Sequence, residues 1–362
     1  MSRQARAVID LDAVRDNLGV ARAAAGGARV MAVIKSDGYG HGLLQVGRAL
    51  GDAVDAFAVT DLDEALALRR AGVEQRIVLL QGPFEAAEIP QAAAEQLELV
   101  VHSGWQIEAL EQARVGAALR LWLKVDTGMH RLGFQPDEVA AAWRRITALP
   151  AQKVLPGVGF MTHLACADDR DDPTTYRQLE AFKDACRGLD GPLSAANSAA
   201  LLGWPETHLD WVRPGIMLYG VSPFSDRQPL DFPLRPAMTM QGRLIAVKQV
   251  SAGQKIGYGA TWRCPEDMPI GVVSIGYGDG YPRHAPSGTP VAVAGWRAPL
   301  VGRVSMDMLA IDLRGMGALP DPGATVTLWG EQPRPEAVAE SAGTIAYELF
   351  CRAPPRVRRV YL

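Results

Sequence analysis

The sequence predicts an α/β protein in which a (β/α)8 barrel of the TIM type is followed by a mainly β domain. Over the first two thirds of the chain, short apolar runs alternate with alanine-rich amphipathic stretches at intervals of roughly 20 to 40 residues. Alternating β and α units favour a parallel sheet, and eight of them in about 220 residues fit a closed barrel. After Phe224 proline-rich sequence leads into runs rich in Val, Ile and Gly, which indicate a second domain.

Each expected barrel strand is a short apolar run bounded by turn residues. The eight runs are residues 29–35, 56–60, 76–81, 97–102, 119–126, 158–164, 193–197 and 211–213. Helices are expected between them, for example at 61–71 and 174–189, where apolar residues recur at helical spacing. We expect the barrel domain to span residues 1–228.

The second domain is expected to span residues 229–362. Its expected strands are separated by Gly or Pro turns and lie at residues 238–250, 270–275, 290–293, 301–313 and 325–329. One helix is expected at residues 335–350.

Composition narrows the function classes. A chain of 362 residues with 48% hydrophobic residues and a net charge of −3 is long enough for two cores and carries no basic block, so neither nucleic acid nor an anionic membrane is an expected partner. No apolar segment is long enough to span a bilayer, and the first residues lack the apolar core of a secretory signal. The four cysteines are far apart, so we expect no metal site and a cytoplasmic protein.

The ends of the expected strands carry the chemistry, because catalytic groups of such barrels sit at the C-terminal strand ends. The first strand delivers Lys35 to a turn with glycines at 38, 40 and 42. A lone lysine in a turn is usually solvated. Ser198, Gly215 and Ile216, however, follow the seventh and eighth strands, where barrels often bind phosphate. A lysine together with a phosphate site is what pyridoxal 5'-phosphate requires.

Eight sequence blocks resemble the bacterial alanine racemase family, in the same order and over essentially the whole chain. The blocks are residues 33–42, 124–133, 162–164, 196–198, 212–220, 257–261, 275–280 and 302–307. The resemblance implies a pyridoxal phosphate bound to Lys35 and a head-to-tail homodimer. In that dimer each active site borrows residues from the β domain of the other subunit.

Racemisation needs a proton removed from one face of Cα and another delivered to the opposite face, hence two bases. The resemblance assigns the D-side to Lys35 and the L-side to Tyr258 of the partner subunit. It also implies that His163 and Arg213 form a chain of contacts from the phenol of Tyr258, through the imidazole and the guanidinium, to the pyridine nitrogen of the cofactor. A permanent cation at that nitrogen disfavours ring protonation, which should suppress transamination.

The resemblance also assigns the remaining site residues. Arg131 would contact the cofactor's phenolate oxygen and the substrate carboxylate. Met306 and Tyr277 of the partner subunit would line the substrate entrance. The residues expected to hold the phosphate are Tyr39, Ser198, Gly215, Ile216 and Tyr347.

Lys124 presents a charge conflict. Strand alternation places Trp122, Lys124 and Asp126 on one face, where an ammonium would be repelled by Arg131 and Lys35. Many relatives in the family carbamylate this lysine, which makes it a negative partner for arginine, and we expect the same here. The alternative is an ordinary Lys124–Asp126 ion pair.

Other functions compete with alanine racemisation. A non-catalytic pyridoxal phosphate carrier would lack equivalents of Tyr258 and Met306. A barrel-type decarboxylase would have a glutamate where Arg213 stands. A broad-specificity racemase, or one for lysine, arginine or serine, stays open, because one methylene changes selectivity by only about 1 to 3 kcal/mol. A biosynthetic role, making D-alanine as a peptidoglycan precursor, and a catabolic role both stay open.

Overall fold

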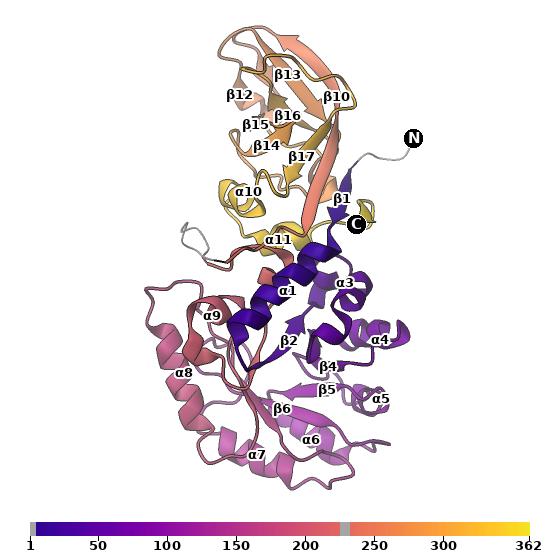
Figure 1. Cartoon of the computed structure of the whole chain (residues 1–362), viewed down its shortest axis with the longest axis vertical. Coiled ribbons are helices and arrows are strands. Elements are labelled where there is room, and N and C mark those ends of the chain that lie inside the picture. Colours follow the sequence, from indigo (N-terminus) through magenta and orange to yellow (C-terminus); the bar gives the residue numbers. More distant parts are fainter. Residues whose placement is uncertain (1–4, 225–231) are drawn as a thin grey trace.

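A computed structural model describes residues 5–224 and 232–362, which form a barrel and a β domain stacked end to end (Figure 1). Eight parallel strands close the barrel, and each falls in a predicted run. The strands are β2 (Arg29–Val33), β3 (Ala56–Val59), β4 (Arg76–Leu79), β5 (Glu98–Val101), β6 (Arg120–Lys124), β7 (Gly159–Met161), β8 (Leu193–Ser194) and β9 (Trp211–Val212). The predicted (β/α)8 barrel is confirmed.

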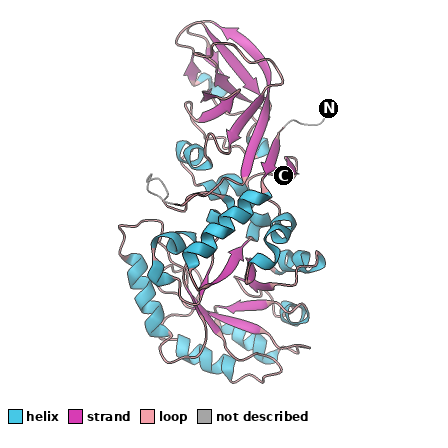
Figure 2. Cartoon of the chain, viewed as in Figure 1, coloured by secondary structure: helices cyan, strands magenta, loops and turns pink. Residues whose placement is uncertain are grey.

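Helices surround the barrel (Figure 2). They are α1 (Leu11–Ala25), α3 (Leu43–Leu50), α4 (Leu62–Arg70), α5 (Glu88–Ala94), α6 (Gly104–Gln112), α7 (Val139–Thr147), α8 (Thr174–Ala185) and α9 (Ser198–Gly203), with 3-10 turns η1 (Gly51–Ala53), η2 (Pro205–Thr207) and η3 (Ile216–Tyr219). Aspartates start two of them: Asp10 accepts from the backbone of Ala13 at 2.9 Å, and Asp61 from that of Glu64 at 3.0 Å. Within the described ranges, no helix is long and apolar enough to cross a membrane.

Two tryptophans fill the barrel interior near its N-terminal end. The rings of Trp122 and Trp211 are 1% exposed and meet edge to face, with centroids 5.8 Å apart. The indole of Trp122 donates to the buried carboxylate of Glu98 at 2.8 Å. Because side chains two residues apart on a strand share a face, Lys124 and Arg213 are directed to the same interior, one layer nearer the C-terminal end.

The β domain is built on an eight-stranded sheet with the order β13-β16-β15-β14-β17-β10-β1-β18. The strands are β1 (Arg6–Ile9), β10 (Met238–Val250), β13 (Met268–Val273), β14 (Pro290–Val293), β15 (Trp296–Val301), β16 (Leu309–Asp312), β17 (Thr325–Trp329) and β18 (Arg358–Tyr361). A small hairpin of β11 (Lys255–Ile256) and β12 (Trp262–Arg263) carries η4 (Tyr258–Ala260), and η5 (Tyr277–Asp279) follows β13. The predicted mainly β second domain is confirmed.

Two predicted elements of this domain are wrong. The strand expected at 301–313 is mostly not one strand: β15 ends at Val301, the chain turns at Gly302, which has a φ of 72°, and only β16 (Leu309–Asp312) lies further inside the range. The single helix expected at 335–350 is in fact two helices, α10 (Pro335–Ser341) and α11 (Ala346–Cys351). The chain breaks between them at Gly343, which has a φ of 67°.

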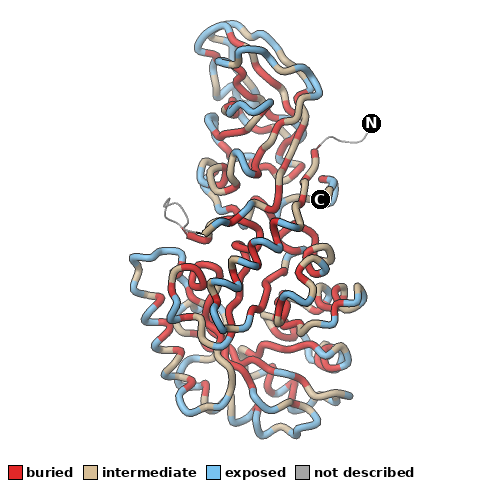
Figure 3. Tube along the Cα trace, in the orientation of Figure 1, coloured by how far each residue is buried: buried red, intermediate tan, exposed pale blue. Residues whose placement is uncertain are grey.

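The first described strand belongs to the sheet of the β domain, which the sequence analysis did not anticipate. β1 pairs antiparallel with β10 and parallel with β18, so the first and last described strands lie side by side in one sheet (Figure 1). The expected domain boundary between residues 228 and 229 lies outside the described residues. Buried residues run through both parts and their junction (Figure 3).

The packing around Trp122 predicts a stability effect. A Cβ at Gly159 would lie 2.4 Å from the Trp122 ring, so Gly159→Ala overpacks the barrel, at a cost of about 1 to 3 kcal/mol. We expect the melting temperature to fall by at least about 3 °C. The matched control is Gly116→Ala, since nothing lies within 4 Å of a Cβ there. Equal melting of the two variants by calorimetry would contradict the packing argument.

Candidate active site

Arg213 is a buried cation at the C-terminal end of the barrel. Only 4% of it is exposed, and its nitrogens are held by neighbouring strand ends. Nη1 donates to Ser194 Oγ at 2.5 Å, and Nη2 donates to the carbonyls of Thr162 at 2.6 Å and Ala195 at 3.1 Å. These contacts fix the plane of the guanidinium.

His163 lies beside this arginine and is held neutral. Arg213 Nη2 is 3.5 Å from His163 Nδ1. Burial, and then the charges of Arg213 and Lys124, hold the pKa of His163 well below its usual range. Because a guanidinium can only donate, Nδ1 is the acceptor and the ring proton resides on Nε2.

Lys124 shares this crowded interior. Its side chain is 9% exposed, and burial followed by the charge of Arg213 lowers its pKa to about 8. No salt bridge joins it to Asp126. The carboxylate of Asp126 instead accepts from the backbone of Gly128 at 3.1 Å and His130 at 2.9 Å. The structure therefore shows no direct Lys124–Asp126 ion pair, although the negative charge of Asp126 still acts on the pKa of Lys124.

Two further cations complete the cluster. Arg131 and Lys124 line one narrow cleft with His163. Burial, and then the charge of Arg131, lowers the pKa of Lys35 below its ordinary value. The structure thus brings together five predicted residues from four strand ends, and the cluster carries an excess of positive charge.

The chain following Lys35 is a left-handed turn within α2 (Lys35–Tyr39). The φ angles of Ser36, Asp37, Gly38 and Tyr39 are 55, 55, 61 and 50°. Each residue with a Cβ costs about 1 to 2 kcal/mol in this conformation, so the surroundings must hold the turn. The turn places the ring of Tyr39 against Tyr219 and its hydroxyl beside Gly215.

The residues expected to hold a phosphate also converge. Ser198 Oγ accepts the backbone N–H of Gly215 at 2.8 Å, and a Cβ at Gly215 would lie 2.8 Å from Tyr39 Oη. The rings of Tyr39 and Tyr347 lie 5.9 Å apart. Burial raises the pKa of both phenols, so both keep their hydroxyl protons as donors. Ile216 starts the adjoining 3-10 turn, η3.

These residues fit pyridoxal phosphate. Among the described residues, the backbone N–H of the fully buried Ile216 has no acceptor, and Arg213 Nε has none either. A phosphate near Ile216 and a ring nitrogen near Arg213 Nε would satisfy them. The surplus positive charge favours an anionic ligand, and the lowered pKa of Lys35 favours the neutral amine that reacts with an aldehyde.

Three predicted residues lie apart from this cluster. Tyr258, Met306 and Tyr277 are on the β domain and are 70%, 52% and 37% exposed. The hairpin that carries Tyr258 lies toward the far end of the molecule from the barrel (Figure 1). Within one chain, the structure does not bring these residues to Lys35.

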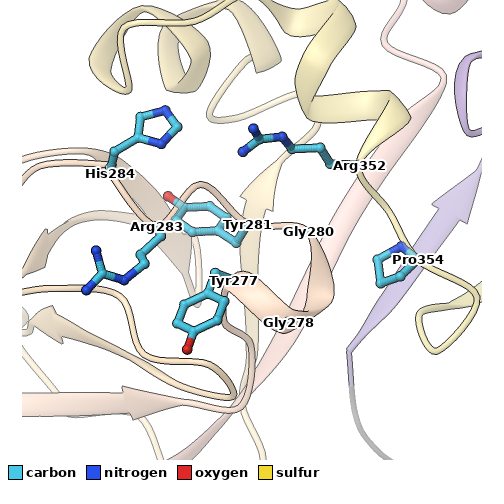
Figure 4. A pocket seen from close by; sticks show the side chains of 8 residues that line it. All are labelled: Tyr277, Gly278, Gly280, Tyr281, Arg283, His284, Arg352 and Pro354. Atoms are coloured by element: carbon cyan, nitrogen blue, oxygen red, sulfur yellow. The ribbon is translucent and has the colours of Figure 1, made fainter.

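A pocket of about 370 Å³ lies on the β domain beside Tyr277 (Figure 4). Arg283 and His284 line it from the loop after η5, and Arg352 lines it from the end of α11. Lys35 does not line this pocket. The pocket therefore marks a face of the β domain and not the lysine cluster.

Sequence reasoning missed three residues that support the cluster. Ser194 and Thr162 orient Arg213, and the ring of Tyr219 stacks on Tyr39 at 4.9 Å. Ser194 lies in the predicted strand next to the one that delivers Arg213, and Thr162 lies in the predicted strand beyond that. A buried guanidinium needs acceptors, and that need was the available signal for both residues.

Known proteins resemble the chain throughout. The family model for the N-terminal domain of alanine racemase matches residues 9–223, and that for the C-terminal domain matches residues 237–361. An alanine racemase of Halorhodospira halophila is 64% identical over 99% of this chain and 98% of its own, and one of Thioalkalivibrio sulfidiphilus is 50% identical over the full length of both. The crystal structure of the biosynthetic alanine racemase from Pseudomonas aeruginosa, 44% identical, superposes with a TM-score of 0.95 over 99% of both chains. The chain belongs to the alanine racemase family of isomerases that act on amino acids.

Proposed function

We propose that the protein interconverts L-alanine and D-alanine with pyridoxal phosphate as cofactor. The observation that supports this most is the convergence of Lys35, Arg213 and the expected phosphate residues at one end of the barrel. When bound, the cofactor withdraws electrons from the amino acid and makes its Cα proton acidic. Its expected contacts are Lys35, Tyr39, His163, Ser198, Arg213, Gly215, Ile216 and Tyr347.

Lys35 is the proposed base for the D-side proton. A base must be neutral to accept a proton, and burial together with Arg131 lowers the pKa of this amine. Arg131, from the strand end opposite, would bind the substrate carboxylate and so orient the Cα proton toward Nζ.

Tyr258 of the partner subunit is the proposed base for the L-side proton. A phenol is a weak base, so its oxygen needs a hydrogen-bond donor when it loses its proton. His163 can supply one, because Arg213 occupies Nδ1 and leaves the proton on Nε2. Met306 and Tyr277 of the partner subunit would line the entrance to this site.

A homodimer would bring the two sets of residues together. The exposed aromatic and methionine side chains of the β domain, Tyr258, Tyr277, Met306 and Met308, suit an interface with a second copy. Since Tyr258 lies far from Lys35 in its own chain, a head-to-tail arrangement is the one that completes each site.

We propose that Lys124 is carbamylated, which would replace one positive charge of the cluster by a negative one. Carbon dioxide reacts only with a neutral amine, and the pKa of about 8 provides one near neutral pH. In the reaction the Nζ lone pair bonds to the carbon of CO2 and one proton leaves for solvent. The resulting carbamate would be an anion beside Arg131.

A racemase for lysine, arginine or serine is the second candidate. Selectivity among these amino acids depends on the volume around the substrate side chain, where one methylene changes the free energy by only about 1 to 3 kcal/mol. A decarboxylase is disfavoured, because Arg213 and not a carboxylate lies at the strand end where the ring nitrogen is expected.

The two-base assignment is tested by solvent exchange. Protein loaded with pyridoxal phosphate should racemise L-alanine, and borohydride should fix the cofactor on Lys35. In Tyr258→Phe, we expect exchange of the α-hydrogen of L-alanine with deuterated water to fall by at least about 100-fold, a typical effect of removing a catalytic base. Exchange from D-alanine should continue through Lys35. Loss of exchange from D-alanine alone would reverse the assignment.

The state of Lys124 is tested by 13C NMR with labelled bicarbonate. A carbamate signal should grow from about pH 6.5 to about pH 8.5, because the neutral fraction of an amine rises as the pH passes its pKa. Lys124→Gln should abolish the signal, whereas Lys153→Gln, which removes a lysine outside the cluster, should leave it. A high-resolution map showing an unmodified Lys124 amine beside Arg131 would contradict carbamylation.

A further inference from the structure

The left-handed turn after Lys35 is held by contacts from outside its own sequence. Ser36, Asp37 and Tyr39 all carry Cβ atoms at positive φ, which their own preferences disfavour. The backbone bonds inside the turn, such as that from Gly40 N to the carbonyl of Ser36 at 3.0 Å, do not select this hand over the usual one. Two side chains far away in the sequence supply the missing constraint.

The barrel holds the turn from one side through Glu64, near the start of α4. One carboxylate oxygen accepts the backbone N–H of Asp37 at 3.0 Å, and the other accepts that of Thr60 at 3.3 Å. The turn is thus tied to the end of the neighbouring strand β3. Asp37 in turn accepts the backbone N–H of Leu43 at 2.8 Å, which joins the turn to α3.

The β domain holds the turn from the other side through Arg359 on β18. Its Nη2 lies 2.8 Å from the carboxylate of Asp37, and its Nε donates to the carbonyl of Gly40 at 2.8 Å. One planar guanidinium therefore spans both ends of the turn. β18 is itself fixed by parallel pairing with β1, in which Arg359 lies opposite Ala7.

Close packing confirms that the β domain fits this turn. A Cβ at Gly40 would lie 2.1 Å from the carbonyl oxygen of Phe350 on α11, and one at Gly42 would lie 2.2 Å from the hydroxyl of Tyr361 on β18. Backbone and side chains of the β domain therefore press directly on the turn that follows Lys35.

We propose that Arg359 is a positioning residue for the reaction, which holds the left-handed turn and thereby places Lys35 Nζ and Tyr39 Oη. It belongs to the same chain as the lysine it serves. The β domain thus supports its own barrel through Arg359, while the proposed function has it supply Tyr258 to the partner. The effect of Arg359 on catalysis, which is the kinetic part of this inference, rests on the proposed function. Its effect on the turn, which is the structural part, does not.

The structural part is tested by hydrogen exchange of the protein without cofactor or substrate. In Arg359→Gln, we expect the amides of residues 36–42 to exchange at least about tenfold faster, because the clamp on Asp37 and Gly40 is lost. Arg358→Gln is the matched control: it removes the same charge one residue earlier on β18, from an exposed side chain that faces the other way. Unchanged protection of the turn in Arg359→Gln, or equal loss in both variants, would overturn the proposal.

A second variant separates loss of the clamp from misfolding of β18. Asp37→Asn removes the ion pair from the opposite end and leaves β18 intact. Its effect and that of Arg359→Gln should add less than fully in the double variant, because both remove the Asp37–Arg359 ion pair, while each also removes one contact of its own. Arg359→Lys should fail to restore protection, since an ammonium cannot span both acceptors. Additive effects, or full protection with lysine, would contradict the clamp.

The kinetic part is tested on the loaded enzyme. Arg359→Gln should lower kcat at least about tenfold and change KM less than about twofold, because it displaces a base and leaves the substrate carboxylate contact of Arg131 in place. Arg358→Gln should keep wild-type values. A rise in KM with unchanged kcat would contradict positioning. If the wild type itself fails to racemise alanine, the proposed function fails, whereas the exchange experiment still decides the clamp.

Discussion

Crowding of positive charge at one end of the barrel is the constraint on which the rest of the site depends. The positive charges of Lys35, Lys124, Arg131 and Arg213 all act on His163 in a largely buried space, and the carboxylate of Asp126 accepts hydrogen bonds from backbone amides. Burial and mutual repulsion hold the pKa of Lys35 and His163 below their ordinary values. The same charge requires anions for balance, which the phosphate, the substrate carboxylate and a carbamate would provide.

The barrel creates this crowding through strand alternation. Trp122 and Trp211 fill the layer beneath, so the residues two positions further along, Lys124 and Arg213, cannot turn outward without inverting their strands. Arg213 is then fixed by acceptors at the ends of the two preceding strands, β7 and β8, and its donor sets the tautomer of His163. The packed layer of Trp122 and Trp211 therefore determines where Lys124 and Arg213 lie, and through Arg213 it determines which ring nitrogen of His163 carries the proton.

Structural features that depend on local sequence patterns could be predicted, whereas features that depend on contacts between distant parts of the chain could not. All eight barrel strands were found, because each is an apolar run bounded by turns, and Lys35, Lys124, His163 and Arg213 follow from their ends. β18 was missed because Arg358 and Arg359 make it look like a polar tail, and only its pairing with β1 makes it a strand. The hand of the turn after Lys35 could not be predicted either, since it depends on Arg359, over 300 residues away. The break at Gly343 shows that apolar spacing alone does not reveal where one helix becomes two.

The central claim is that one chain supplies Lys35 and another supplies Tyr258. It is tested most directly with heterodimers of a Lys35→Ala chain and a Tyr258→Phe chain, co-expressed with different affinity tags and purified through both. Each homodimer should be inactive, because neither has a complete site. In the heterodimer one of the two sites combines an intact lysine with an intact tyrosine, so the account predicts about half of the wild-type activity. Activity no higher than that of the two inactive homodimers would contradict it.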